Sequence, residues 1–302
     1  MENLVEPRGA ELPGCSITIK CANDPLIERC LDSIDDDVSV HAVITPSEAI
    51  EAILRARGIP FTRTDYGNIA KSCEIGVNEA EHDNIIVMDS DSSFAPGSIR
   101  RLREALQHYP LARGKVQILG NTAMSEMIAK RRQVFYDCED FTVNPGLALR
   151  RDVVREHCGG FVFNPLVRWT EDADLNFRAR QAGLKVGFVP ESVILHDPVA
   201  LKHELRTAFL YGVGKRLSVE HTPDRQSVEG LWDITVAAFK GLSPRSVISK
   251  LREYGPGVML LERAWRVLYL AGYHAQKHTG RWSVQGADAR PADTDLPVPH
   301  LS

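Results

Sequence analysis

The sequence predicts an α/β fold, in which a Rossmann-like, mostly parallel sheet is flanked by helices and followed by a helical C-terminal extension. Two observations predict it: short β-branched runs alternate with helical stretches over residues 16–88, and only helical spacing follows residue 198. The composition agrees, because 302 residues with 43% apolar and 25% charged residues are typical of a soluble globular protein with one large or two modest domains.

The first 88 residues alternate strictly between strand and helix patterns. The uninterrupted apolar run at 85–88 is typical of a strand buried on both faces of a parallel sheet. Ser47 is a suitable N-cap for the second helix, and Gly58 is a suitable end. We predict strands over 16–20, 38–44, 61–64 and 84–88, and helices over 25–34, 48–57 and 69–80.

The rest of the chain has a weaker pattern, and we assign no element to residues 112–140. The apolar spacing after Trp169 is helical and stops at Gly183. We predict a helix over 99–111, a strand over 141–149, a helix from Trp169 to Gly183, strands over 185–189 and 193–195, and helices from 201 and over 258–273.

Charge and cysteine content narrow the function classes. The formal net charge of −4 provides no basic field that would hold nucleic acid, so we expect no nucleic-acid partner. The six cysteines form no CxxC pair and no zinc spacing, so we expect buried thiols. Because the first residues lack the pattern of a secretory signal, we expect a cytoplasmic protein.

The longest apolar region, residues 257–272, contains Glu262, Arg263 and Arg266 and therefore cannot cross a bilayer at low cost. Its aromatic and basic side chains leave two alternatives. The helix packs on the core or on a second subunit of a homodimer, which we favour, or it makes a peripheral membrane contact.

Two carboxylates, Asp89 and Asp91, directly follow the predicted strand at 84–88. Ligands of a doubly wound sheet bind beyond the carboxyl ends of its strands. Alternate residues of an extended segment point to one side, so these carboxylates would repel each other unless a cation lies between them. Mg²⁺ or Mn²⁺, completed by substrate phosphates, would fit such a pair. The alternative is an acidic loop in solvent.

A second acidic group, Glu171, Asp172 and Asp174, lies at the predicted start of a helix. Acidic residues at this position also stabilise the helix dipole, so the group alone favours helix capping over catalysis. The sequence that continues from it, TEDADLNFRARQAGLKVGFVPESVILHD, ends in His196 and Asp197.

Together these motifs resemble those of the family-2 glycosyltransferases, which have the GT-A fold. The resemblance covers about residues 16–215 and rests on the order of an apolar N-terminal strand, the DxD triplet, the TED triplet and a terminal histidine. Asp91 and Glu171 are 80 residues apart, and Asp172 and His196 are 24 apart, as in that family. It implies a lead over 1–15, a GT-A domain over 16–215, a helical region over 216–280 and a disordered tail over 281–302.

The resemblance also implies a role for each matching residue. Asp91 is the main expected metal ligand, Asp89 helps to hold the metal or the nucleotide, and His196 is a further ligand unless it is structural. Asp172 matches the catalytic base, with Glu171 as the second choice, and Asp174 is expected on the helix surface.

Four further residues are expected to bind the donor on the same grounds. Lys20 and Asn23 lie where the family contacts the nucleotide, although a lysine in place of a small residue is unusual. Lys215 and Arg216 lie on the helix that follows the site, where they reach the diphosphate or form a solvated helix end.

Departures from the family pattern also carry information. Thr45, Pro46 and Ser47 replace an Asp-Asp-Gly-Ser type of turn that contacts the base, so recognition of the base is in doubt. The Gln-x-x-Arg-Trp element of processive synthases is absent, which favours transfer of a single sugar.

The predicted function is that of an inverting, metal-dependent glycosyltransferase of the hexosyltransferase class. It would use Mg²⁺ or Mn²⁺ to move one sugar from a nucleoside-diphosphate sugar, with uridine as the expected base, to a hydroxyl of a small-molecule, glycan or lipid-linked acceptor. One alternative is a nucleotidyltransferase, although the Gly-rich loop with Arg and Lys after the first strand is missing. Another is an inactive nucleotide-sugar-binding protein of the same fold.

Overall fold

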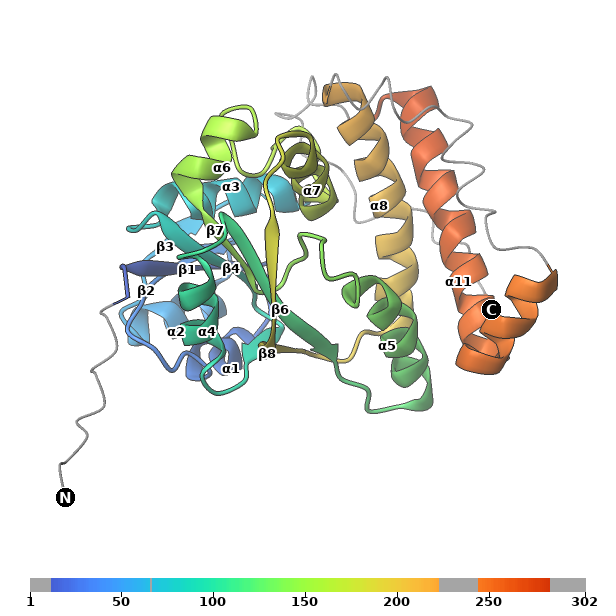
Figure 1. Ribbon diagram of the computed structural model, residues 1–302, viewed down its shortest axis with the longest axis horizontal. Coiled ribbons are helices and arrows are strands. Elements are labelled where there is room, and N and C mark those ends of the chain that lie inside the picture. Colours follow the sequence, from blue (N-terminus) through green and yellow to red (C-terminus); the bar gives the residue numbers. More distant parts are fainter. Residues whose placement is uncertain (1–11, 66, 223–243, 283–302) are drawn as a thin grey trace.

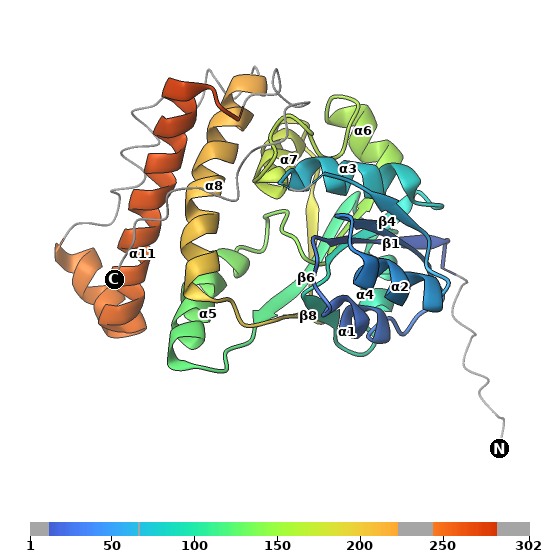
Figure 2. The same cartoon turned by 180° about the vertical axis from the view of Figure 1, so that it is seen from behind.

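The computed structural model describes residues 12–65, 67–222 and 244–282. Most of the predicted lead, part of the predicted helical region and nearly all of the predicted tail lie outside the described residues. The described part consists of a sheet with helices on both faces and a group of long helices at one end (Figures 1 and 2).

The sheet has eight strands in the order β3-β2-β1-β4-β7-β6-β8-β5. The β1–β2, β1–β4, β2–β3 and β6–β8 pairs are parallel, whereas β7 and β5 run antiparallel to their neighbours. The predicted mostly parallel sheet is therefore confirmed. The strands are β1 (Cys15–Cys21), β2 (Ser39–Ile44), β3 (Phe61–Arg63), β4 (Asn84–Asp89), β5 (Ser92–Phe94), β6 (Leu111–Ile118), β7 (Leu147–Arg150) and β8 (Val186–His196).

Helices cover both faces of this sheet because the strands in its middle are apolar on both sides. In β4, Ile86 and Met88 belong to one core cluster, whereas Ile85 and Val87 belong to another. Helices of one face are α1 (Ile27–Asp32), α2 (Glu48–Ala56) and α4 (Ser98–Ala105), and those of the other are α3 (Ile69–Glu79), α6 (Arg151–His157) and α7 (Glu171–Gln181).

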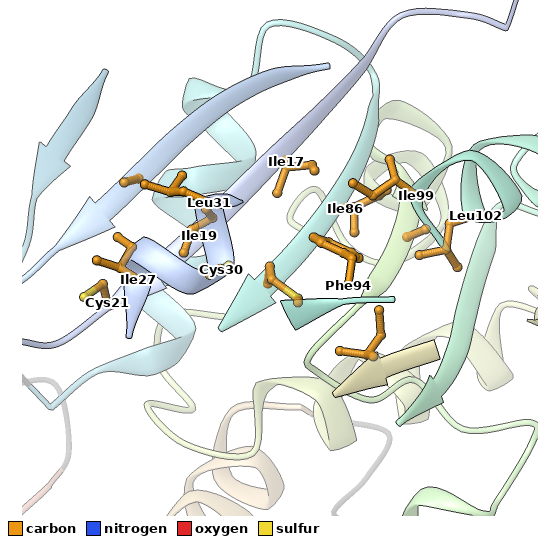
Figure 3. Close-up of a cluster of buried hydrophobic side chains, with 14 of the residues drawn as sticks. Ile17, Ile19, Cys21, Ile27, Cys30, Leu31, Ile86, Phe94, Ile99 and Leu102 are labelled. Atoms are coloured by element: carbon orange, nitrogen blue, oxygen red, sulfur yellow. The ribbon is translucent and has the colours of Figure 1, made fainter. Parts of the chain in front are cut away.

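The core cluster on the first face holds the N-terminal strands and helices together. Figure 3 shows Ile17, Ile19 and Ile86 of the sheet beside Cys30 of α1 and Ile99 of α4. All five side chains are fully buried. Burial of such a side chain stabilises the fold by about 1.5–3 kcal/mol. The strands β1 and β4 are therefore held firmly against α1 and α4.

Three helices stand beside the sheet: α5 (Ala123–Tyr136), α8 (Leu201–His221) and α11 (Pro244–Thr279), of which α11 bends at Gly255. Helices α8 and α11 lie side by side, and a Cβ at Gly212 would come within 1.9 Å of the Tyr269 carbonyl oxygen. A Cβ at Gly272 would equally meet the Phe209 carbonyl oxygen. One face of the predicted 258–273 helix therefore packs on α8. Within the described ranges, no helix combines the length and hydropathy that a membrane span requires.

The structure corrects several predictions in the middle of the chain. The helix predicted over 99–111 ends at Ala105, and the unassigned stretch contains β6 and α5. The strand predicted over 141–149 is limited to β7, because residues 141–146 form a loop with a cis peptide bond before Pro145. The two strands predicted over 185–195 are one strand, β8, with a register shift opposite Gly114.

The cysteine prediction holds at five of the six positions. All six cysteines are free, but Cys138, near the C-terminal end of α5, is exposed. The prediction missed it because the segment around it has no periodicity from which burial could be inferred.

Candidate active site

The candidate site lies at the sheet edge where β1, β4 and β8 have their carboxyl ends. Because β7 is antiparallel, its amino end, which Asn144 precedes, reaches the same edge. Lys20 and Asp89 are register partners on β1 and β4, and Ser92 pairs with His196 between β5 and β8. The topology therefore brings together residues from five separate parts of the chain.

Lys20 forms an ion pair with two of the carboxylates. Its Nζ lies 2.9 Å from Asp89 Oδ1 and 3.1 Å from Glu171 Oε1, and its side chain is 16% exposed. Burial opposes the charge of this ammonium group, but the carboxylates of Asp89 and Glu171 raise the pKa of Lys20 well above its ordinary value. Lys20 is therefore a fixed cation inside the acidic group, which the sequence did not predict.

Asp91 and His196 face each other at the other end of this group. His196 Nε2 lies 3.8 Å from Asp91 Oδ2. The Nδ1 atom of His196 lies 2.8 Å from the carbonyl oxygen of Asp197, which only accepts, so Nδ1 carries the proton. In the neutral imidazole, the lone pair of Nε2 therefore points toward the Asp91 carboxylate.

Asp172 lies in the first turn of α7, which begins after Thr170 in a left-handed conformation (φ 65°). Its Oδ1 accepts a hydrogen bond of 2.7 Å from the Ala173 amide, and the Thr142 hydroxyl donates to its carbonyl oxygen at 2.7 Å. Burial, followed by the neighbouring Glu171 carboxylate, raises the pKa of Asp172 to about 7. A carboxylate with this pKa accepts a proton near neutral pH.

Glu171, the second choice for the base, is buried and already paired. Besides Lys20, its Oε1 accepts a 3.3 Å hydrogen bond from Asn144 Nδ2. The other amide atom of Asn144, Oδ1, is buried and has no hydrogen-bond partner within the described residues. The geometry therefore favours Asp172 over Glu171 for proton transfer and adds Asn144, whose only sequence signal was its place beside Pro145 and Gly146.

Two of the predicted donor-binding residues lie apart from this group. Asn23 lies in the loop after β1, where its Oδ1 accepts a 2.8 Å hydrogen bond from the Ser47 hydroxyl. Arg216 Nε lies 2.7 Å from Glu220, one turn further along α8, and its Nη1 lies 3.5 Å from the Tyr273 hydroxyl on α11. Lys215 precedes it on α8. The donor-binding roles of all three residues stay predictions.

Asp174 was expected on the helix surface, and that expectation is wrong. Its side chain is completely buried. It pairs with Arg178 Nε at 2.8 Å and accepts hydrogen bonds from the hydroxyls of Ser218 and Thr222 on and after α8. The carboxylate thus fixes the helix that carries Asp172 against α8.

The residues present fit a divalent cation that is held partly by its substrate. Among the described residues, no three His, Cys, Asp or Glu side chains gather closely enough to hold a metal by themselves. The separation of Asp91 Oδ2 and His196 Nε2 lies within the roughly 4.2 Å that two ligands of one Mg²⁺ can span. Mg²⁺ characteristically takes one or two protein ligands and completes its shell with phosphates and water. Asp89 is less available, because Lys20 pairs with it.

The mostly parallel eight-stranded sheet with helices on both faces matches the GT-A fold of glycosyltransferases, as the sequence predicted. The chain is similar to the crystal structure of GalNAc-T7 with UDP, GalNAc and Mn²⁺, with a TM-score of 0.51 and 13% sequence identity over 89% of this chain. The match covers 58% of that chain, so this chain spans little more than half of its length.

The chain is also similar to TarS of S. aureus. The structure of TarS residues 1–349 in complex with UDP-GlcNAc matches with a TM-score of 0.48 and 12% identity, over 89% of this chain and 91% of that one. No family model matches the sequence, and no curated protein matches it. Membership of family 2 therefore stays a prediction.

Proposed function

We propose that the protein is a glycosyltransferase that moves one sugar, with inversion, from a uridine-diphosphate sugar to an acceptor hydroxyl. The observation that carries the proposal is the position of Asp172, a carboxylate with a pKa of about 7, at the same sheet edge as the Asp91–His196 pair. The GT-A fold supports it, and the similar GalNAc-T7 structure contains UDP and Mn²⁺.

In the proposed reaction, Asp172 acts as the general base. Its Oδ1 already accepts a hydrogen bond from the Ala173 amide, so Oδ2 is the atom that takes the proton of the acceptor hydroxyl. The acceptor oxygen attacks the anomeric carbon as the bond from that carbon to the diphosphate oxygen breaks. Inversion requires this base on the face opposite to the leaving group.

Two further groups of the chain position the donor in this scheme. The unpartnered Oδ1 of Asn144 is an acceptor suited to a hydroxyl of the donor sugar. Asp91 Oδ2 and His196 Nε2 would hold the divalent cation. When bound, that cation neutralises the charge that develops on the leaving diphosphate.

The test is to incubate the purified protein with Mn²⁺ and a panel of UDP-sugars and to measure release of UDP. Wild-type protein should release UDP. Asp172→Asn should reduce turnover by about 10²–10⁴-fold, the usual contribution of a general base, and should still bind UDP in calorimetry. On the acid side, the wild-type rate should rise with pH through about 7, because Asp172 must be deprotonated to act.

The matched control is Asp140→Asn, which removes a carboxylate from an exposed ion pair. Its partner in that pair, Arg180, lies on the same helix as Asp172. This variant should keep its activity. Full activity of Asp172→Asn would remove Asp172 from the proposed role. Binding of UDP-sugars without turnover, over many acceptors, would favour the inactive binding protein instead.

A further inference from the structure

Beside the acidic edge, α5 and α8 present a second group of polar side chains that the proposed reaction does not use. Arg132 and Tyr136 lie one turn apart on α5 and therefore share a face, as do Glu204 and Tyr211, two turns apart on α8. The two faces meet, because Arg132 Nε lies 2.7 Å from Glu204 Oε2. Arg132 and Tyr211 on these faces are named the α5–α8 site below.

Arg132 is largely buried but incompletely paired. Its side chain is 12% exposed, and its bond to Glu204 is the only hydrogen bond it makes within the described part of the chain. The four N–H groups of its two terminal nitrogens therefore have no protein partner there. Glu204, which is completely buried, is also paired with Arg131, and Arg131 pairs in addition with Glu262. Arg132 therefore shares its one carboxylate with a second guanidinium group.

Tyr211 contributes an unpaired hydroxyl. The edge of its ring packs against Trp265 of α11 with 6.4 Å between the ring centres, and its hydroxyl makes no hydrogen bond to a described residue. Burial raises the pKa of Tyr211, the Arg132 charge opposes this rise, and the Asp172 carboxylate adds to it. The phenol thus lies within electrostatic reach of both Arg132 and the proposed base.

A chain of contacts ties the same face of α5 to the acidic edge. The Tyr136 hydroxyl donates to the Asn144 carbonyl oxygen at 3.2 Å, and the Asn144 side chain donates to Glu171. Glu171 directly precedes Asp172. Tyr136, one turn from Arg132 on α5, thus links the helix that carries Arg132 to the residue beside the proposed base.

We propose that Arg132 and Tyr211 bind an anionic oxygen group, a phosphate or a carboxylate, of the acceptor. The unpaired edge of a guanidinium group matches two oxygens of such a group, and the Tyr211 hydroxyl can donate a further hydrogen bond. That the ligand is an acceptor rests on the proposed function. That the ligand is an anion rests on the contacts of Arg132 and Tyr211 alone.

The carboxylates of the acidic edge explain why such a ligand needs a separate cation. A phosphate brought next to Asp172 would be repelled by Asp172 and Glu171, since Lys20 is already paired with two carboxylates. A guanidinium group at the α5–α8 site offsets that repulsion and fixes which hydroxyl of the acceptor faces Asp172. An uncharged sugar could accept a hydrogen bond from this group but would gain no ionic attraction.

The experiment uses glycerol 3-phosphate as the probe and glycerol as its neutral counterpart. Calorimetry with the full chain should show that the phosphate probe binds at least tenfold more tightly than glycerol. Arg132→Gln should abolish that preference, Arg132→Lys should retain part of it, and Tyr211→Phe should weaken probe binding about threefold. Melting temperatures establish that each variant is folded, and Arg131 still pairs with Glu204 when Arg132 is replaced.

Lys130→Gln is the matched control, because it removes one positive charge from an exposed position of α5. It should leave probe binding unchanged. A second titration with UDP separates the two sources of a phosphate. If Arg132→Gln weakens UDP binding and leaves the probe unaffected, Arg132 serves the donor and the proposal is overturned.

Failure of this proposal differs from failure of the proposed function. Equal binding of glycerol and glycerol 3-phosphate by a protein that does release UDP would overturn the α5–α8 site only. Probe binding that depends on Arg132, in a protein that turns over no UDP-sugar, would support an anion site and contradict the glycosyltransferase.

Discussion

The acidic edge of the sheet has two ends, and they differ in how their charge is balanced. At one end, Lys20 lies between Asp89 and Glu171, with both contacts near 3 Å. At the other end, Asp91 contacts the neutral Ser92 hydroxyl and His196, and its side chain is 39% exposed. The first end carries its own cation, whereas the second is open to one from outside.

The difference shows that the two aspartates of one D-x-D triplet can have different surroundings. Asp89 and Asp91 are two residues apart, yet the first is held by a strand neighbour and the second is turned toward solvent. A resident ammonium group keeps the Asp89–Glu171 end assembled without any ligand. In the proposed function, the Asp91–His196 end would take up and release its cation together with a substrate.

The largest expected effect comes from Asp91→Asn, which removes the carboxylate of the Asp91–His196 end. Loss of this carboxylate should weaken Mn²⁺ binding by about 100-fold or more, because the remaining protein ligand is a single imidazole. Titration of Mn²⁺ in the presence of UDP, followed by electron paramagnetic resonance, measures it. Asp65→Asn, at a carboxylate that is 89% exposed, is the control and should bind Mn²⁺ as the wild type does. Unchanged Mn²⁺ affinity in Asp91→Asn would show that the two ends do not differ as described.

The next effect comes from removing the resident cation with Lys20→Met. It leaves the Asp89 and Glu171 carboxylates without their shared cation and should lower the free energy of unfolding by about 2 kcal/mol after allowance for their partial exposure. Because the folded-state pKa of Lys20 lies above 10.5, its contribution is fully present at neutral pH and is lost only in strong alkali. Urea unfolding at pH 8 measures the loss.

Lys20→Arg is the matched variant, and it should recover more than half of the lost stability. The deficit of Lys20→Met should also shrink as the pH falls, because burial already raises the pKa of Asp89 and its protonation relieves the repulsion from Glu171. A deficit that is independent of pH would mean that Lys20 acts through packing and not through charge.

The smallest expected effect is on the pH dependence of stability in Asp172→Asn. Unlike Asp89 and Glu171, Asp172 is not paired with Lys20. Its folded-state pKa of about 7 lies above the ordinary 3.8, so the protonated carboxyl stabilises the fold. This contribution is present below pH 3.8 and is lost as the pH rises to 7. Asp172→Asn should therefore equal the wild type near pH 4 and exceed it by about 1 kcal/mol at pH 8.

Chemical unfolding of both proteins at several pH values checks this prediction. Asp140→Asn, in an exposed ion pair, should show no such trend. If Asp172→Asn were less stable than the wild type at pH 8, the carboxylate would be satisfied in the fold, and its candidacy as a base would weaken.

Much of the fold could be predicted, because most helices and strands show their own apolar period within the segment that forms them. The alternation of strands and helices up to Met88 was predicted nearly to the residue, since each element there has its own apolar period. Strand β6 was missed because Arg113 and Lys115 interrupt its apolar residues. Arg113 is nevertheless buried, since it donates to the carbonyl oxygens of Tyr136 and Cys138 and lies over the Phe188 ring.

The sequence predicted six residues of the candidate site, but it did not predict how their charges are paired. Asp89, Asp91, Glu171, Asp172, Lys20 and His196 lie at one edge because strand ends are fixed by topology, which the element order implies. The Lys20 bridge, the Asn144 contact and the burial of Asp174 depend on residues more than 25 positions apart in the chain. No local pattern encodes such pairs.

The crossing of α8 and α11 at Gly212 and Gly272 has a consequence for how the protein can change. Tyr211 directly precedes Gly212, so the depth at which its phenol stands depends on backbone contact with α11. A methyl group at position 272 would meet the Phe209 carbonyl oxygen and push the two helices apart, which would displace Tyr211. On the role proposed for Tyr211, a defect in acceptor binding can therefore originate in a residue that carries no functional group.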